Sequence, residues 1–173
     1  MSQIGDVWRE AAAKWSEVSG QVADEHWDLP TNCGDWTVRD LVDHAMHWQA
    51  MGGSVFGAGT TPGDDWATIE PKLSAALDDP SNLEGVAEQM GGMPKQQVVG
   101  FVIGDLVLHS RDLARAIGAD DTLPAGAVQA TLMGLQRVPE EMLRGETMFG
   151  PPIAVGDDAS TQDQLLAFSG RQP

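Results

Sequence analysis

Three ionisable side chains interrupt an apolar segment that runs from residue 98 to residue 116. Asp105, His109 and Asp112 follow one another at steps of four and three residues, so a helix would place all three on one face. The rest of the segment is rich in Val, Ile and Leu, which indicates a buried helix. Ionisable groups are rarely buried unless they are paired or bind a metal. The spacing of Asp105 and His109 puts their Cβ atoms about 5–6 Å apart, which suits two ligands of one ion.

A third ligand is available on the helix expected over residues 38–56. His44 lies on the apolar face of that helix, whereas His47 falls on its polar face and is expected to be exposed. Sites in helical bundles are built from side chains on facing helices. If the two helices face each other, His44, Asp105 and His109 converge. Two imidazoles and one carboxylate leave coordination positions open, as a catalytic metal site does.

Simpler interpretations of the same residues remain open. The His and Asp side chains could form a buried hydrogen bond without a metal. Asp112 and Arg111 could orient a ligand or pair with each other. Cys33 is the only cysteine, which excludes an internal disulfide, and no cation lies beside it in the sequence to activate its thiol. We therefore expect Cys33 to be a small packing residue. Trp48 and Trp66 could line a pocket, but core packing is the expected role of both.

Several catalytic signatures are absent from the sequence. It has no H-E-x-x-H motif and no pair of E-x-x-H motifs, which argues against a zincin or a di-iron bundle. It also has no G-x-G-x-x-G motif and no P-loop, so nothing indicates a nucleotide site. A metal-binding helical protein therefore remains the most specific hypothesis that the spacing supports.

The composition predicts one globular domain over residues 1–173. Hydrophobic residues make up 42% of the 173 residues, which is enough for a core. Lys and Arg total 10 against 26 Asp and Glu, and the net charge of −16 would repel nucleic acid and anionic membranes. No apolar run approaches the roughly 20 residues of a membrane span, and the N-terminus does not resemble a signal peptide. We expect a cytoplasmic protein that binds no membrane.

Apolar periodicity predicts an all-α protein, a four-helix bundle with long connections and a short C-terminal helix. Pro71 should make the third helix begin near Glu70, and Pro139 should bend or divide the fifth. The segment 83–93 could be extended or a single helical turn. Helices are expected over residues 4–22, 38–56, about 70–77, 98–117, about 125–144 and 160–168.

Two segments resemble a known family. Residues 31–44 resemble the second-helix signature of the DinB-like superfamily, and more narrowly the metal-binding domain of mycothiol-dependent maleylpyruvate isomerases of actinobacteria. Residues 105–118 resemble the helix of that family in which an acid stands four places before a His, followed by Asp-Leu-Ala. The tail, residues 149–171, is similar to the end of a short, single-domain branch of the family. The resemblance spans most of the chain.

The resemblance implies a four-helix bundle that holds a divalent metal, usually zinc, through His44, Asp105 and His109. Three features depart from the isomerase itself. Asp105 stands where the isomerase has Glu, and Arg111 stands where relatives often carry Trp. We also expect no counterpart of the second, C-terminal domain of the isomerase. The shorter Asp105 requires the helices to approach closely or the ion to lie nearer the helix that carries it.

The expected function is that of a metal-dependent enzyme that uses a low-molecular-weight thiol such as mycothiol. A metal-bound thiol loses its proton, and the thiolate can attack a small electrophile, giving transfer or isomerisation. Two imidazoles and a carboxylate favour zinc, with nickel or iron as alternatives. Two other functions remain open, a non-catalytic metal- or ligand-binding bundle and a metal-dependent hydrolase. The expected partners are the thiol and the electrophile, and a homodimer is left open.

Overall fold

The computed structural model describes residues 3–144 and 148–173, and within them it confirms an all-α fold. Strand is confined to a small antiparallel pair in which Val86 lies opposite Pro94. In chain order the elements are α1 (Gln3–Ser19), the 3₁₀ helix η1 (Asp24–His26), α2 (Val38–Val55), α3 (Trp66–Leu77), η2 (Pro80–Leu83), β1 (Val86–Ala87), η3 (Glu88–Met90), β2 (Met93–Pro94), α4 (Lys95–Ile117), α5 (Ala125–Leu135), α6 (Glu140–Leu143) and α7 (Thr161–Phe168).

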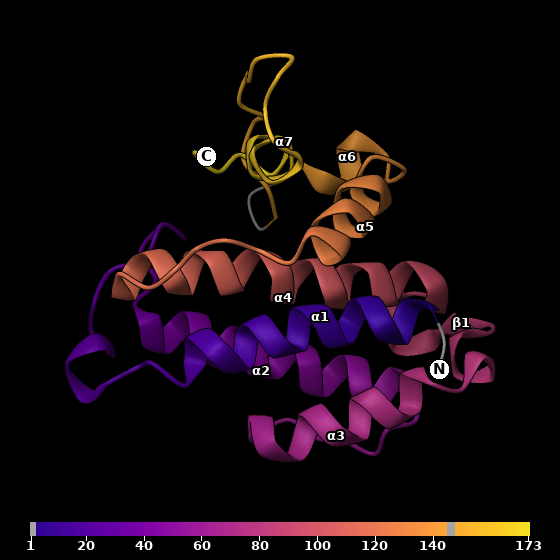
Figure 1. Ribbon diagram of the computed structural model, residues 1–173. Coiled ribbons are helices and arrows are strands. Elements are labelled where there is room, and N and C mark those ends of the chain that lie inside the picture. The colour runs from indigo at the N-terminus through magenta and orange to yellow at the C-terminus, as the bar shows by residue number, and fades with distance from the viewer. Residues whose placement is uncertain (1–2, 145–147) are drawn as a thin grey trace.

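Helix α4 is the centre of the molecule. It packs against α1 and α2 on one side and against α5 on the other, while α3 covers α1 and α2 and α7 packs on α5 (Figure 1). Its apolar side chains are accordingly buried on several sides, as those of Val98, Val102 and Leu106 show. This confirms the prediction of a buried helix, and Gly118 ends it in a left-handed conformation with φ of 72°.

The two helices that carry the predicted ligands run antiparallel. Gln49 of α2 donates a hydrogen bond of 2.8 Å from Nε2 to the carbonyl oxygen of Val102 on α4. Five residues earlier on α2, Nε2 of His44 lies 3.0 Å from Oδ1 of Asp105 on α4. Residue numbers therefore rise along α2 as they fall along α4. The buried Gln49 side chain also accepts a bond from the indole of Trp8, so it ties α1, α2 and α4 together.

A glycine allows α2 and α4 to approach closely. A Cβ atom added at Gly52 would lie 2.7 Å from Cγ2 of Val102, closer than side chains tolerate. Only Gly at this position lets the two backbones come together without displacing Val102. A close approach of the helices, one of the two arrangements expected for the short side chain of Asp105, is therefore present two turns from His44.

The prediction that the third helix begins near Glu70 is wrong. Helix α3 begins at Trp66, and Asp65 caps it by accepting a hydrogen bond of 2.9 Å from the backbone N–H of Thr68. Pro71 lies inside the helix, where it removes a single backbone donor. The cap and the buried apolar face of α3 outweigh that loss, which the sequence pattern alone does not show.

The chain after α4 folds back over the bundle. Pro139 divides the predicted fifth helix into α5 and the short α6, one of the two outcomes expected for it. The segment 83–93 contains both predicted conformations, because a 3₁₀ turn separates β1 from β2. Helix α7 begins at Thr161, and its N-cap residue, Ser160, accepts a hydrogen bond from the backbone N–H of Asp163. The C-terminal tail thereby reaches the far end of α4.

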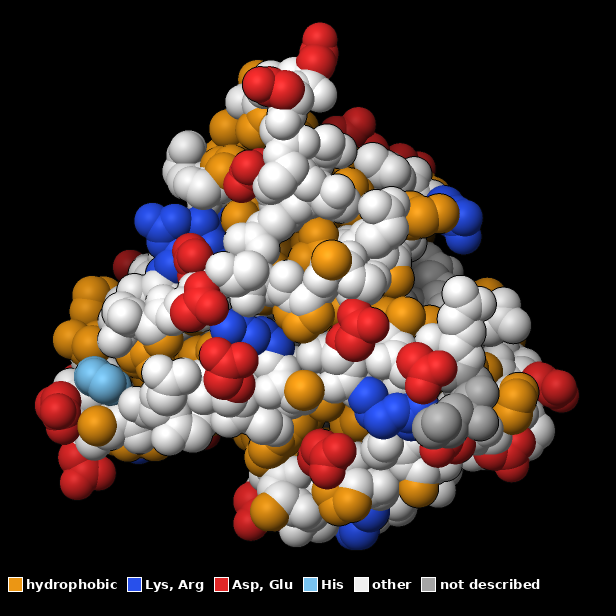
Figure 2. Space-filling model, in the orientation of Figure 1, with side chains coloured by type: hydrophobic (Ala, Val, Ile, Leu, Met, Phe, Trp, Pro, Cys, Tyr) orange, Lys and Arg blue, Asp and Glu red, His pale blue; other side chains and the backbone are white. Residues whose placement is uncertain are grey.

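The surface reflects the acidic composition. Figure 2 shows acidic side chains scattered over one face of the molecule, with few basic ones between them. The acids do not gather in a single patch on that face, which fits a general contribution to solubility better than a binding surface. Within the described ranges, no helix has the length and apolar content needed to cross a membrane.

Candidate metal centre

The start of α2 fixes the position of His44. Thr37 caps the helix by accepting from the backbone N–H of Asp40, and the Asp40 carboxylate accepts a bond of 2.9 Å from the N–H of Thr37. The helix phase set here makes His44 half-buried and leaves His47 exposed. The predicted difference between the two histidines is confirmed.

His44, Asp105 and His109 converge between α2 and α4. Oδ1 of Asp105 lies 3.0 Å from Nε2 of His44 and 3.4 Å from Nε2 of His109. The other carboxylate oxygen, Oδ2, is buried and has no hydrogen-bond partner in the described structure. One ligand atom from each residue lies within 4.8 Å of the others, a separation compatible with binding of one ion. The geometry therefore brings the three predicted residues together, and their metal binding stays a prediction.

Asp112 orients the ring of His109. Its Oδ2 lies 3.1 Å from Nδ1 of His109, on the opposite side of the ring from Asp105. A carboxylate can only accept, so the proton of a neutral His109 belongs on Nδ1, and the Nε2 lone pair is directed at Asp105. Two acceptors would then face each other across 3.4 Å, unless Nε2 is protonated or a cation lies near. The two carboxylates thus favour a positive charge at the His109 ring, from a proton or from a bound cation.

The electrostatics agree with that conclusion. Burial lowers the pKa of His109, but the charge and hydrogen bonding of Asp105, together with the hydrogen bonds between His109 and the side chains of Asp112 and Cys33, raise it well above its ordinary value. Burial raises the pKa of Asp105, but the neighbouring imidazoles of His109 and His44 outweigh burial and lower it. In the absence of a metal, these surroundings therefore favour the protonated form of His109.

Asp112 is fully buried and fully satisfied. The guanidinium of Arg171 donates to both of its oxygens, with distances of 2.8, 3.0 and 3.1 Å, and Asn32 donates to Oδ1 at 2.9 Å. Burial raises the pKa of Asp112, but the hydrogen bond to His109 and the charge of Arg171 hold it well below its usual range. These contacts tie the C-terminal tail and the loop before α2 to α4.

Arg111 does not pair with Asp112, so that suggested arrangement is wrong. The two side chains are neighbours in the sequence and leave the helix in different directions. Arg111 donates to the backbone carbonyl of Gln172, and its Nε lies 3.6 Å from Asp121. The cation that Asp112 binds comes from the end of the chain, 59 residues later.

Cys33 packs against the hydrophobic core, as expected, and it also contacts polar groups that its sequence neighbours do not reveal. Its Sγ lies 3.3 Å from Oδ2 of Asp112 and 3.9 Å from Nδ1 of His109, and the side chain is half-buried on a cavity wall. Residues adjacent to Cys33 in the sequence do not indicate these contacts. His109 and Arg171 reach Cys33 from distant parts of the chain.

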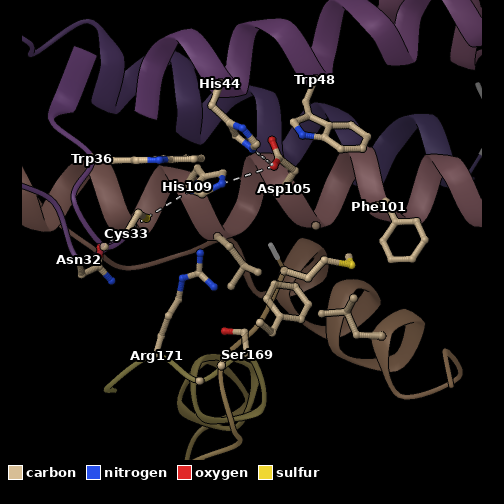
Figure 3. Close-up of a pocket in the computed structure, with 18 of the residues that line it drawn as sticks. Asn32, Cys33, Trp36, His44, Trp48, Phe101, Asp105, His109, Ser169 and Arg171 are labelled. Carbon is tan, nitrogen blue, oxygen red and sulfur yellow. Dashed lines mark hydrogen bonds and ion pairs between the residues drawn. The ribbon is translucent and has the colours of Figure 1, made fainter. Parts of the chain in front are cut away.

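A cavity of about 940 Å³ opens beside the converging residues. His44, Asp105 and His109 line it, and Cys33 and Arg171 lie on one side of them (Figure 3). Trp48 also lines the cavity, which is the alternative to its expected role in the core. Trp66 packs against the core as expected, tilted against Trp8 and edge-on to Trp15. The cavity gives small molecules access to the side of the site that faces away from the core.

Comparison with known proteins identifies the family. Residues 8–148 match the sequence model of the mycothiol maleylpyruvate isomerase N-terminal domain. The chain belongs to this family. It is also similar to uncharacterised proteins from two strains of Mycobacterium tuberculosis, each 25% identical over 154 residues that cover 82% of this chain and 83% of the relative. No solved structure matches the chain significantly. The predicted relationship to the DinB-like superfamily and its all-α fold is thereby confirmed.

The site fits the divalent metal that membership of this mycothiol isomerase family implies. The unpartnered Oδ2 of Asp105 and the Nε2 atoms of His44 and His109 supply donors of the types that zinc prefers. A second cluster, Cys33 with His109 and Asp112, has compatible spacing. It fits less well, because Asp112 already binds Arg171 with both oxygens. The orphaned carboxylate oxygen distinguishes the first cluster from the second.

Proposed function

We propose that the chain binds one divalent ion, with zinc favoured, through His44, Asp105 and His109. The observation that carries the proposal is the buried Asp105 carboxylate, which faces two imidazole Nε2 atoms and has one oxygen without a partner. A buried carboxylate oxygen without a partner is costly, and a divalent ion would satisfy that oxygen and both imidazoles together. Three protein ligands leave a coordination position for a further molecule.

We propose further that a low-molecular-weight thiol, mycothiol in view of the family, takes the open position. A bound divalent ion would supply the acidity that makes the thiol a thiolate at neutral pH. The residues of the chain would then position the reactants: Asp112 holds the His109 ring, and Arg171 fixes Asp112. We place this activity in one cytoplasmic domain, since a free thiol persists in a reducing compartment.

The proposed reaction joins the thiol sulfur to an electrophilic carbon of a small molecule. If the adduct takes up the proton that the thiol lost, the product is a thioether and the reaction is a transfer. If the carbon–sulfur bond breaks again after rotation about the former double bond, the result is isomerisation. Both outcomes begin with the same addition step and need the same site. The proposal is therefore addition of the thiol, and product analysis distinguishes transfer from isomerisation.

The test is thiol consumption by the metal-loaded protein. Free mycothiol is titrated in the presence of a panel of electrophiles, and loss of the thiol signal should require both metal and electrophile. His109→Ala should abolish the loss, and His47→Ala, an exposed position on the same helix as His44, should leave it unchanged. Turnover without thiol would instead indicate hydrolysis by bound water. No turnover across the panel would indicate a non-catalytic binding protein.

A further inference from the structure

The cavity extends past the proposed ligands into an apolar chamber. Trp48 lies one helical turn after His44, and Phe101 lies one turn before Asp105. Because α2 and α4 run antiparallel, the two aromatic residues are on the same side of the His44–Asp105 pair. Figure 3 shows both rings on the side away from Cys33 and Arg171. The two aromatic side chains therefore lie about one turn, roughly 5 Å, along the helices from the His44–Asp105 pair.

The rest of the chamber is also apolar and comes from separate elements. Met90 and Met93 line it from the segment of η3 and β2, Leu135 from α5 and Met142 from α6. Methionine side chains are unbranched and adaptable, and they are common where a surface must fit apolar ligands of variable shape. Met142 is 45% exposed, so it lies where the chamber meets solvent. An apolar molecule could enter there and remain in contact with hydrophobic walls.

The chamber has no free cation to bind a carboxylate. Among the described residues that line the cavity, Arg171 is the one Lys or Arg side chain. Its guanidinium is already bound to both oxygens of Asp112 at the opposite end of the cavity. The chain as a whole carries a charge of −16. A second carboxylate of a small dicarboxylate would therefore lose its hydration in the chamber without gaining a partner.

We propose that the electrophile is an uncharged, predominantly apolar molecule whose reactive carbon lies beside His44 and Asp105 and whose hydrocarbon portion fills the chamber between Trp48, Phe101 and Met93. The position of the reactive carbon rests on the function proposed above. The position of the hydrocarbon portion rests on the chamber alone. An α,β-unsaturated ketone with a linear alkyl chain has the required form.

The chemistry of such a substrate balances without a further reactant. The thiolate sulfur forms a bond with the β-carbon, and the electron pair of the carbon–carbon double bond moves toward the α-carbon and the carbonyl oxygen. The α-carbon then takes up one proton, equal to the proton that the thiol released. No bond to a leaving group breaks, and nothing is oxidised or reduced.

Binding is tested first, on the full chain treated with EDTA so that the result is independent of metal chemistry. The neutral fluorophore Nile red should bind, and saturated ethyl alkyl ketones should displace it. Each added methylene should strengthen displacement about three- to fourfold until the chamber is filled. Met93→Gln should weaken ketone binding at least about tenfold. Met133→Gln is the matched control, because Met133 is an exposed methionine of α5 outside the cavity lining.

Turnover is tested second, with mycothiol, metal and vinyl ketones from methyl to heptyl. kcat/KM should rise with chain length as binding does, and Phe101→Ala should flatten that dependence. The inference would be overturned if displacement of Nile red did not depend on the chain length of the ketone, or if Met93→Gln and Met133→Gln weakened ketone binding equally. Faster turnover of a small dicarboxylate such as maleylpyruvate would also overturn it. Length-dependent binding without any thiol turnover would support the chamber and refute the proposed function, so the two failures are distinguishable.

Discussion

Two carboxylates on one face of α4 have opposite surroundings. Asp112 is fully buried, and both of its oxygens are filled by Arg171, Asn32 and His109. Asp105, seven residues earlier, faces the cavity and keeps one buried oxygen without a partner. A saturated carboxylate has no capacity left for a ligand, whereas an unsaturated one does. The difference supports the proposal that Asp105 binds the ion and that Asp112 positions His109.

His109 connects the two carboxylates. Its Nδ1 faces Asp112 at 3.1 Å and its Nε2 faces Asp105 at 3.4 Å. Hydrogen bonding of one ring nitrogen to a carboxylate is typical of metal-binding histidines, because it fixes the tautomer and the ring orientation. The contrast between Asp105 and Asp112 can therefore be tested by changing Asp112 itself and by removing His44, a partner of Asp105.

The largest effect is expected from Asp112→Asn. This change leaves the buried guanidinium of Arg171 without its counter-charge and should lower the free energy of unfolding by about 3–5 kcal/mol. Urea denaturation of the metal-free protein measures it. Asp43→Asn is the control, since Asp43 is an exposed acid on α2, and its effect should stay within about 0.5 kcal/mol. Equal effects at the two positions would show that the Arg171–Asp112 pair does not stabilise the tail.

A smaller effect should follow from His44→Ala, and only when metal is present. Zinc at about a hundredfold excess over its Kd should stabilise the unmodified protein by about 2.7 kcal/mol. His44→Ala should remove most of that stabilisation, because it deletes a proposed ligand. His47→Ala should keep it. Thermal unfolding with and without zinc compares the variants, and an equal response of both would contradict the assignment of His44.

The smallest expected effect is the pH dependence of stability and of zinc affinity, which differs between the metal-free and the metal-bound protein. Because the pKa of His109 is raised in the folded protein, its proton stabilises the metal-free fold fully below about pH 6.5, and this contribution is lost as the pH rises through the raised pKa. Metal must displace that proton, so its affinity should rise about tenfold per pH unit, or about 1.4 kcal/mol, until His109 is deprotonated. Zinc titrations at several pH values measure the slope. A pH-independent affinity would exclude His109 as a ligand.

The sequence predicts the centre of this site because its evidence is local. Asp105 and His109 share a helix, and their four-residue spacing fixes their relative position. His44 follows from a capping motif and an apolar stripe on a second helix. The family resemblance then relates the two helices. Each step depends on residues within a few turns of one another.

The surroundings of the site could not be predicted in the same way. Cys33 lies beside His109, 76 residues away, and Asp112 binds Arg171, 59 residues away. Neither pairing has a periodic signal, because each depends on how a loop and a tail fold over α4. The predicted start of α3, near Glu70, is wrong for a related reason. Propensity excluded Pro71 from a helix interior, but the Asp65 cap and tertiary burial outweighed that preference.

The most direct test of the account is the metal content of the protein, purified without chelator and measured by elemental analysis. The contrast between Asp105 and Asp112 predicts one divalent ion per chain, and its loss in Asp105→Ala. If the unmodified protein contains no stoichiometric metal, and added zinc or nickel leaves its melting temperature unchanged, the account is contradicted. His44, Asp105 and His109 would then form only a hydrogen-bonded connection between α2 and α4.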